Sequence, residues 1–475
     1  MPAPGPHGTQ LLYALIVVGV VGRTSALRGV MFRNGWRVLA TMLGITAAIG
    51  GLMMATVANG SISGRPHPPT MLRLGFREAA DGGWFSTGSL YARDGLSVGP
   101  PRAGSAGLQD AAVGCSSAVA EASPIASART AFLQVSHPPF GVAATRVGHW
   151  AFVDELGRKL LVLRDDSLKP RIVRSIRLPY GQPLGMTLTP EGRYLLIADI
   201  MNGVWVVSVT RAERGERSPV LGTLTEPGQL DKGGGAIEVA TSRDGNYVFV
   251  SLEDRNQVAV YDLGEALAEH FRVSSYVGVI PLGIAPVGLA VSPDGRRLYA
   301  TSELSPNTWP QGTLSVIDVL AAEKSPKHAV RASVPAGCSP VRVALSPNGS
   351  IAWMTARGSD ALLAFSTRAL IRHAHALLAA IPVGEAPVGL AVVARGALIV
   401  VGNSDRFHVA GAGADLMVVS AKAALAHQPA MLGTVPSGIF PRDMALEPDG
   451  DTLLVATYVY PWSLEAISIK SLEQP

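Results

Sequence analysis

Short apolar runs separated by tight polar turns recur throughout residues 130–470. In Val287–Ser302, an apolar run is followed by a Ser-Pro-Asp-Gly turn and then by a second apolar run. Alternating apolar positions with many β-branched residues predict strands, and Pro and Gly stand where a tight hairpin turn requires them. The unit predicts four strands, at Val287–Ser292, Arg297–Ser302, Leu314–Val319 and Ala329–Val334.

The same unit recurs seven times along the chain. Six copies begin at a proline and a degenerate copy begins at Ala236, with successive copies 44 to 54 residues apart. The six prolines are Pro139, Pro183, Pro286, Pro340, Pro387 and Pro441. Repeats of this length form solenoids or propellers, because one unit cannot bury its own apolar face. We predict an all-β fold, a seven-bladed β-propeller with four strands in each blade.

The two ends of the repeat region predict how the ring closes. The repeat that begins at Pro441 shows only three strands, at Met444–Glu447, Leu453–Thr457 and Leu464–Ile469. Thr130–Ser136 precedes Pro139 as Ala430–Val435 precedes Pro441. The pattern predicts a three-plus-one closure, in which the N-terminal strand completes the last blade and covers its edge.

The N-terminal region carries an export or anchoring signal. Val38–Val57 is a run of 20 uncharged, mostly apolar residues, long enough to cross a bilayer as a helix. Arg33 and Arg37 precede it, so residues beyond it are expected outside the cytoplasm. Translation from Met31 rather than Met1 would give an ordinary signal peptide, cleaved after Ala58; without cleavage the helix is a membrane anchor. Both alternatives stay open.

Composition divides the chain into three predicted parts. Residues 1–58 are the signal or anchor segment, and residues 129–475 are the propeller. Residues 59–128 are rich in Gly, Pro, Ala and Ser without a period, which predicts a largely disordered linker. The protein is therefore expected to be extracytoplasmic, either secreted, periplasmic or anchored with the propeller outside.

Charge and motifs narrow the expected partners. Only 16% of the residues are charged, the net charge is +4, and the propeller has no Lys/Arg run, so no nucleic-acid partner is expected. No metal-binding or cofactor-binding motif is present, which predicts neither a metal nor a cofactor. The two cysteines, Cys115 and Cys338, allow one disulfide without requiring it, since unpaired thiols are the commoner case. A monomer is expected.

The repeats resemble the YVTN-type β-propeller family, named after a tetrapeptide in strand two. The approximate matches are Tyr299–Ser302, Val400–Asn403 and Val455–Tyr458, and the Pro286–Gly295 wording fits best. The resemblance covers about residues 130–470 and implies the fold. Its members include surface-layer-associated proteins, ligand- or nucleic-acid-binding propellers and lactonase-like enzymes, so it does not by itself name a function.

Candidate site residues lie in the loops between strands two and three and in the connections between blades. Two of these loops are long, Glu303–Gly312 and Asn403–Ala414. The candidate catalytic residues are Arg342, Arg442, Glu303 and His408. The candidate ligand-binding residues are Trp309, Asp405, Arg406, Phe407 and Glu385. Glu253–Arg255 is expected to be a charged hairpin tip.

Two functions follow from these features. The first is an extracytoplasmic, non-enzymatic propeller that binds a protein or cell-envelope ligand through its loop-rich face, with a membrane contact through the N-terminal helix if that helix is not cleaved. The alternative, implied by the resemblance, is a lactonase-like hydrolase. In that case arginine would polarise the lactone carbonyl, and a carboxylate or histidine at the propeller mouth would activate water.

Overall fold

The computed structural model describes residues 113–473 apart from short gaps (116–118, 166–167, 202, 228–233, 273, 373–374 and 407–412). It also describes a two-residue strand pair, β1 (Arg77–Glu78) with β2 (Trp84–Phe85). The predicted helix Val38–Val57, residues 1–58 and most of the predicted linker lie outside the described residues. No helix among the described residues is long and apolar enough to cross a membrane.

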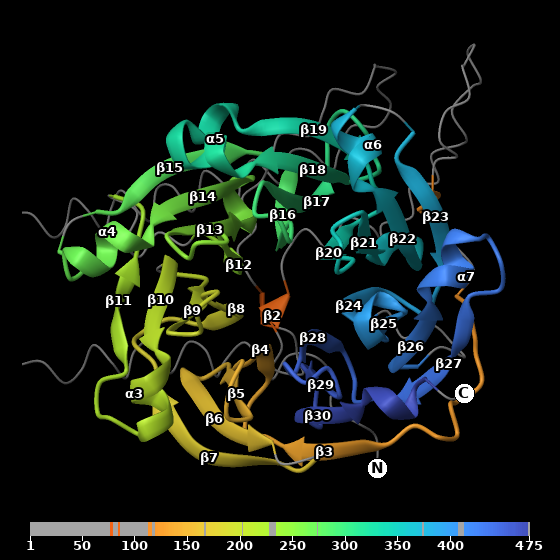
Figure 1. Cartoon of the computed structure of the whole chain (residues 1–475), viewed down its shortest axis with the longest axis horizontal. Helices are drawn as coiled ribbons and strands as arrows, with labels where there is room; N and C mark the ends of the chain where they lie inside the picture. The colour runs from red at the N-terminus through yellow and green to blue at the C-terminus, as the bar shows by residue number, and fades with distance from the viewer. Residues whose placement is uncertain are drawn as a thin grey trace, which may run out of the picture. The chain divides into compact units, whose positions relative to one another are not determined.

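Seven four-stranded antiparallel sheets form a ring, which confirms the predicted seven-bladed all-β propeller (Figure 1). Blade one contains β4 (Pro139–Ala144), β5 (Trp150–Glu155), β6 (Lys159–Asp165) and β7 (Pro170–Arg177). Blade two contains β8 (Pro183–Leu188), β9 (Tyr194–Asp199), β10 (Gly203–Ser208) and β11 (Val220–Leu224). Blade three contains β12 (Ala236–Thr241), β13 (Tyr247–Leu252), β14 (Gln257–Asp262) and β15 (Tyr276–Pro281). Blade four contains β16 (Ile284–Val291), β17 (Arg297–Leu304), β18 (Thr313–Asp318) and β19 (Val330–Pro335).

The remaining blades repeat this order. Blade five contains β20 (Pro340–Leu345), β21 (Ile351–Ala356), β22 (Ala361–Ser366) and β23 (Leu377–Pro382). Blade six contains β24 (Pro387–Val393), β25 (Leu398–Asn403), β26 (Asp415–Ser420) and β27 (Met431–Pro436). Blade seven contains β28 (Pro441–Leu446), β29 (Thr452–Thr457), β30 (Ser463–Ser468) and β3 (Thr130–Gln134). The first strand of every blade lies nearest the ring centre (Figure 1).

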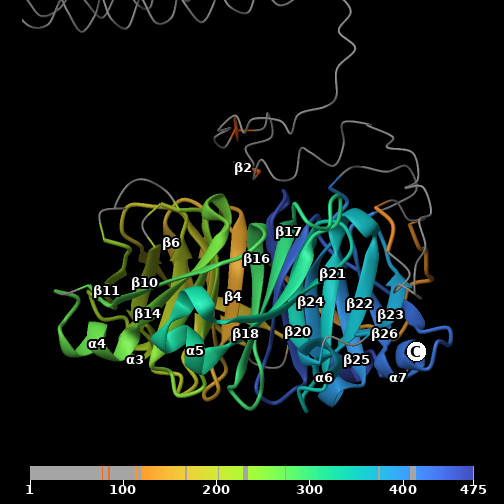
Figure 2. The same cartoon turned by 90° about the horizontal axis from the view of Figure 1, so that it is seen from above.

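Short helices connect strands three and four in blades two to six. They are α3 (Val209–Arg214), α4 (Leu263–Ala268), α5 (Val319–Lys324), α6 (Thr367–Ile371) and α7 (Ala421–Leu425). Each begins after a Ser or Asp whose side chain accepts a backbone N–H of the first turn, a standard N-cap. All five lie at one face of the ring (Figure 2). We call the other face, which carries the strand-two-to-three loops and the blade-to-blade connections, the mouth face.

Apolar side chains between neighbouring blades form the core. Trp205 packs with residues of blades one and two, and Trp353 packs with residues of blades five and six. Both indoles are 1% exposed. Each sheet therefore packs its faces against the neighbouring blades and not against solvent. A single repeat could not bury its apolar face in this way.

Blade seven joins strands from distant parts of the sequence. β3 pairs antiparallel with β30, with Thr130 opposite Ile467 and Gln134 opposite Ser463. The backbone N–H of Val135, which is buried, then donates to the carbonyl of Trp462 at 3.1 Å. The outer edge of blade seven is thus covered by the segment that precedes blade one.

Part of the predicted linker packs on the propeller. Ile125 is buried against blade six, and its N–H donates to the carbonyl of Thr434 on β27. The N–H of Ala120 donates to the carbonyl of Val383, which follows β23. A disulfide joins Cys115 to Cys338 in the connection between blades four and five, across 223 residues. Contacts with the propeller therefore begin well before residue 129.

Removal of β3 tests the role of this strand in the ring. A chain that begins at residue 137 leaves β30 with an unpaired edge, and we expect it to aggregate or to lose a cooperative thermal transition. A chain that begins at residue 129 differs only by Arg129, β3 and the two residues after it, and should unfold cooperatively. Equal melting temperatures of the two chains would contradict this prediction.

The disulfide should contribute about 2–4 kcal/mol to the free energy of unfolding, because it constrains a long loop of the unfolded chain. Urea unfolding with and without a reductant measures this contribution. The Cys115→Ser variant should match the reduced wild type and should not respond to the reductant. A wild-type unfolding curve that the reductant leaves unchanged would contradict the prediction.

Candidate functional site at the channel mouth

Three repeated positions place side chains at the ring centre. We number the motif from its first residue, so that in blade four position one is Pro286, position two Val287 and position three Gly288. The third set consists of the residues at the end of strand two or directly after it, such as Glu303 near the end of β17 and Glu253 directly after β13. Strand one is innermost in every blade, so these positions from all seven blades lie near the ring centre (Figure 1). We call the space between them the channel.

Position two of every blade and most of the third set line a cavity at the mouth of this channel. The free volume is about 60 Å³, enough for roughly four water molecules. The lining residues are Phe140, Leu156, Gln182, Leu184, Ile200, Ile237, Glu253, Val287, Glu303, Val341, Arg342, Arg357, Val388, Arg406, Arg442 and Tyr458. Six of the seven position-two residues are apolar, and the seventh is Arg442.

Position three explains how the channel is filled. Four blades have glycine there; a Cβ on Gly288 would lie 2.1 Å from the carbonyl oxygen of Val341 in the next blade. The other three blades have Glu238, Arg342 and Asp443. These three blades are the third, fifth and seventh, so the three charged side chains reach the channel from different sides.

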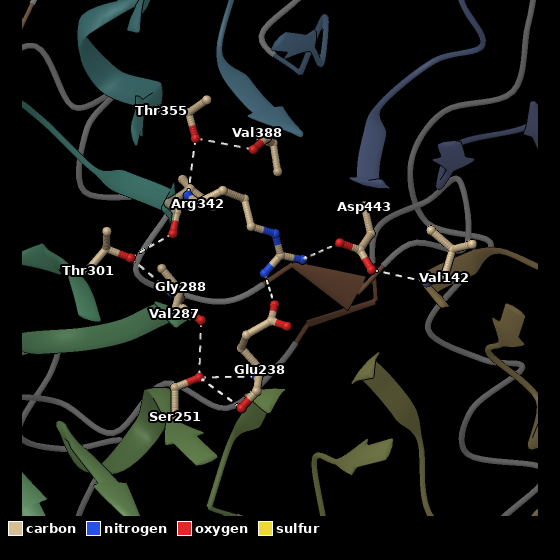
Figure 3. Close-up of polar contacts among 11 residues, drawn as sticks. Val142, Glu238, Ser251, Val287, Gly288, Thr301, Arg342, Thr355, Val388 and Asp443 are labelled. Atoms are coloured by element: carbon tan, nitrogen blue, oxygen red, sulfur yellow. Dashed lines mark hydrogen bonds and ion pairs between the residues drawn. The ribbon is translucent and has the colours of Figure 1, made fainter. Parts of the chain in front are cut away.

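The three charged residues form one ion-pair network (Figure 3). Arg342 donates to Glu238, and its second terminal nitrogen lies 3.7 Å from Asp443 Oδ1. Asp443 Oδ2 also accepts the backbone N–H of Val142 in blade one at 3.0 Å. A single guanidinium thus links blades three, five and seven, and Asp443 extends the link to blade one.

Hydroxyl groups of strand two join neighbouring blades below the mouth (Figure 3). Thr301 Oγ1 accepts the N–H of Gly288 at 2.8 Å and donates to the carbonyl of Val341 at 2.6 Å. Thr355 makes the same pair of contacts with Arg342 N–H and the carbonyl of Val388. The side chain therefore bridges its own blade and the next, which fixes the backbone that carries the charged residues.

Burial changes the acid–base properties of the network. Burial raises the pKa of Glu238 from 4.5 to about 7, although Arg342 opposes the shift. Burial also raises the pKa of Asp443. Burial alone would lower the pKa of Arg342, but Glu238 and Asp443 raise it above its ordinary value. Arg342 therefore stays charged at neutral pH, whereas the carboxyl groups beside it bind a proton more readily than they would in water.

A second charged layer lies at the cavity wall. Arg357 Nη2 donates to Glu303 Oε2 at 2.9 Å, and both side chains are buried. Burial and the nearby charge of Arg357 lower the pKa of Arg406 to about 9. Glu253 is 5% exposed, and its negative charge acts on Arg406 and on Arg442. Arginines and carboxylates thus face one another around the cavity.

Arg442 lies in an aromatic cage. Its guanidinium carbon is 3.6 Å from the ring centre of Phe140, 5.3 Å from that of Phe440 and 5.5 Å from that of Tyr458. Burial, together with the charge of Arg342, lowers its pKa to about 10. No carboxylate among the described residues lies within ion-pair distance of Arg442 in the structure, so π faces stabilise this charge in place of an anion.

The structure brings four of the candidate residues to the cavity. The residues that line it are Glu303, Arg342, Arg406 and Arg442. Arg342 also belongs to the ion-pair network with Glu238 and Asp443. Glu385 is buried and Asp405 half-buried, but neither lines the cavity, and Trp309 is 59% exposed on the mouth face. His408 and Phe407 lie outside the described residues.

Several cavity residues were missed from the sequence. Glu253–Arg255 forms the turn between β13 and β14, as predicted, but nothing in the sequence indicated that Glu253 itself is buried and lines the cavity. Arg357 at the cavity wall, and Glu238 and Asp443 in the ion-pair network below it, were not singled out either. Comparison of the repeats position by position offers the signal: a charged residue stands at position three where other copies have glycine, or directly after strand two where other copies have an apolar residue.

Comparisons with known proteins support the fold and the resemblance. A family model described as "Lactonase, 7-bladed beta-propeller" matches residues 181–412. With the seven observed blades, this match confirms the predicted resemblance to lactonase-like propellers. A search of curated proteins finds no match. A chain of the hydrazine synthase of Kuenenia stuttgartiensis has a TM-score of 0.55 and 16% identity, and the match covers 71% of this chain and 97% of that chain. At this identity the likeness shows the fold alone.

The raised pKa of Glu238 predicts a pH dependence of stability. The folded protein holds a proton on Glu238 up to about pH 7, whereas the unfolded chain releases it near pH 4.5. The contribution of Glu238 to the free energy of unfolding is therefore present below about pH 4.5 and lost as the pH rises through 7. The Glu238→Gln variant has no charge to bury at this position.

Denaturant unfolding of wild type and Glu238→Gln between about pH 4 and 8 measures this effect. We expect the stability of wild type relative to the variant to fall as the pH rises across this range. A difference that stays constant with pH would show that Glu238 titrates at the same pH in both states.

Proposed function

We propose that the protein is a lactonase-like hydrolase whose active site is the cavity at the channel mouth. One observation carries the proposal: arginines and carboxylates from blades three to seven converge on a cavity that otherwise has apolar walls. Such a site suits the hydrolysis of an ester, because negative charge develops on the carbonyl oxygen and a water molecule must lose a proton. The family match over residues 181–412 supports the same reaction class.

The residues of the cavity divide into roles. Arg442 and Arg406 would stabilise the developing oxyanion, since they line the cavity and stay protonated at neutral pH, with pKa values of about 10 and 9. Glu253, whose charge acts on both arginines, would accept the proton of the attacking water. The Glu303–Arg357 pair would orient the ester, and the Arg342 network would hold the floor of the site.

The size of the cavity limits what enters it. A free volume of about 60 Å³ accommodates a carbonyl group and a water molecule but not a whole drug-sized ligand, which needs about 300 Å³ or more. The ester end of the lactone would enter, and the remainder would lie in the open mouth above. The apolar residues at position two would then contact the carbon atoms of the ring that is opened.

The proposed location is outside the cytoplasm. The Cys115–Cys338 disulfide supports it, because structural disulfides persist in oxidising compartments and are rare in the cytosol. The run Val38–Val57 remains a prediction of an export signal or an anchor. Secretion, a periplasmic location and membrane anchoring are all compatible with this proposal.

A second candidate function is non-catalytic binding of a protein or cell-envelope ligand by the mouth face. The observation that favours it is a set of exposed aromatic side chains in the loops of that face: Tyr180, Trp309 and Tyr460 are 71%, 59% and 66% exposed. Exposed aromatic residues are frequent at binding surfaces. A ligand held by this rim would need none of the buried charges.

A panel of lactones of different ring size tests the first proposal. We expect hydrolysis of at least one lactone above the buffer rate, and we expect Glu253→Gln and Arg442→Met each to lower kcat/KM by about 100-fold or more. Arg368→Met is the matched control, because Arg368 is exposed on α6 at the opposite face. It should retain wild-type activity.

Thermal melting of each variant separates lost chemistry from lost folding. Glu253→Gln keeps the shape of the side chain and should keep the wild-type melting temperature. No hydrolysis of any lactone, or full activity in both cavity variants, would refute the enzyme. In that case, loss of ligand binding in a Trp309→Ala and Tyr460→Ala double variant would support the second candidate function, in which the exposed aromatic residues of the mouth face bind the ligand.

A further inference from the structure

The face opposite the mouth carries a cluster of potential metal ligands at the boundary between blades seven and one. Glu447 and Asp449 lie in the turn between β28 and β29, and His149 lies in the turn between β4 and β5. One ligand atom from each of the three lies within 4.8 Å of the others, and His149 Nδ1 is 3.9 Å from Glu447 Oε2. We propose that these three residues bind a divalent transition-metal ion.

Comparison with the other repeats gives an independent reason. Blades three and four have a serine at the position of Glu447 and an aspartate at that of Asp449. Ser242 donates to Asp244, and Ser292 donates to Asp294, both at 2.6 Å. The bond from Ser292 lowers the pKa of Asp294, and the bond from Ser242 lowers that of Asp244 against the effect of burial. The serine hydroxyl therefore stabilises the aspartate charge in these turns.

Blade seven replaces this donor by a second carboxylate. Glu447 is 3% exposed, so its charge is poorly solvated, and Asp449 stands two residues away in the same turn. The two carboxylates, which have oxygen atoms within 4.8 Å of each other, repel each other, and burial strengthens the repulsion. His149 approaches from the neighbouring blade rather than from the same turn. A cation held by all three would balance the two negative charges.

The donor set selects the kind of ion. One imidazole nitrogen and two carboxylate oxygens suit Zn²⁺ and, less strongly, Mn²⁺, whereas Ca²⁺ prefers oxygen ligands alone. Ligands of a tetrahedral Zn²⁺ are about 3.4 Å apart. The donor atoms would therefore approach one another by roughly half an ångström to one and a half ångströms. His149 and Asp449 are exposed turn residues whose side chains can make this movement, and water would complete the coordination.

The position of the site gives the ion a structural role. It would connect the first turn of blade one with the first turn of blade seven, the two blades at which the sequence begins and ends its circuit. Asp443 already accepts Val142 N–H across this boundary near the channel. A metal ion at the opposite face would add a second cross-link, far from the proposed catalytic cavity.

Titration of metal-free protein with ZnCl₂ tests the proposal. After treatment with EDTA and removal of the chelator, wild type should bind one Zn²⁺ per chain by calorimetry, with MnCl₂ weaker and CaCl₂ weakest. Bound Zn²⁺ should raise the melting temperature by about 2–4 °C. The His149→Ala variant should bind Zn²⁺ at least tenfold more weakly.

Two further variants keep the test decisive. Glu447→Ser restores the residue of blades three and four, so it should fold with at least wild-type metal-free stability and lose Zn²⁺ binding. His427→Ala removes another exposed histidine from the same face, in the turn after α7, and should bind Zn²⁺ as wild type does. Unchanged Zn²⁺ affinity in both His149→Ala and Glu447→Ser, or no bound ion in wild type, would overturn the proposal.

Discussion

The close approach of seven inner strands at the ring centre governs the rest of this structure. Each blade brings its first strand so near the next that position three of the motif has no room for a Cβ in most blades, as at Gly288. The other three blades carry Glu238, Arg342 and Asp443 at this position, and their opposite charges pair at the ring centre. The backbone thereby fixes both the architecture and the polar floor of the site.

The same crowding explains the chemistry above that floor. Burial lowers the pKa values of Arg406 and Arg442 at the cavity and raises that of Glu238 in the ion-pair network below it. Arg442 remains charged because aromatic rings of blade one and of blade seven surround it. A cavity of this kind interacts strongly with a polar group that enters it, since little solvent is present to compete. A hydrolase and a specific binding site would both have this property. In the first proposed function the ligand enters the cavity, whereas in the second it contacts only the exposed aromatic residues of the mouth face.

Much of the fold could be predicted from the sequence because the repeat is local. Hairpin turns such as Pro293–Gly295 and the strand pattern around them repeat at a fixed period, so blade number and strand positions follow without knowledge of contacts. The Cys115–Cys338 disulfide could not be predicted in the same way, because its partners are 223 residues apart and obey no repeat. The packing of Ile125 on blade six was missed for a similar reason, since the Ala- and Ser-rich stretch around it has no periodic pattern.

The site was predictable only in part. Arg342 and Arg442 stand in the motif itself and could be placed at the propeller mouth, whereas the charged triplet that begins at Glu253 indicated a hairpin tip and gave no sign of a buried side chain. Its burial depends on the neighbouring blades, which a single repeat does not reveal. Departures from the repeat carry the information that is needed. Glu238, Arg342 and Asp443 stand where the other four copies have glycine, and Arg442 stands where the other six copies have an apolar residue.

The central claim is that the buried charges at the channel mouth form a site for a ligand rather than an internal brace. A crystal structure of the protein with the hydroxy acid released from a hydrolysed lactone tests it most directly. The account predicts that the carboxylate of this acid lies in the cavity and contacts Arg442 and Arg406, with Glu253 beside it. A cavity that contains only water while the acid occupies the aromatic rim, or no acid at all under saturating conditions, would contradict the claim.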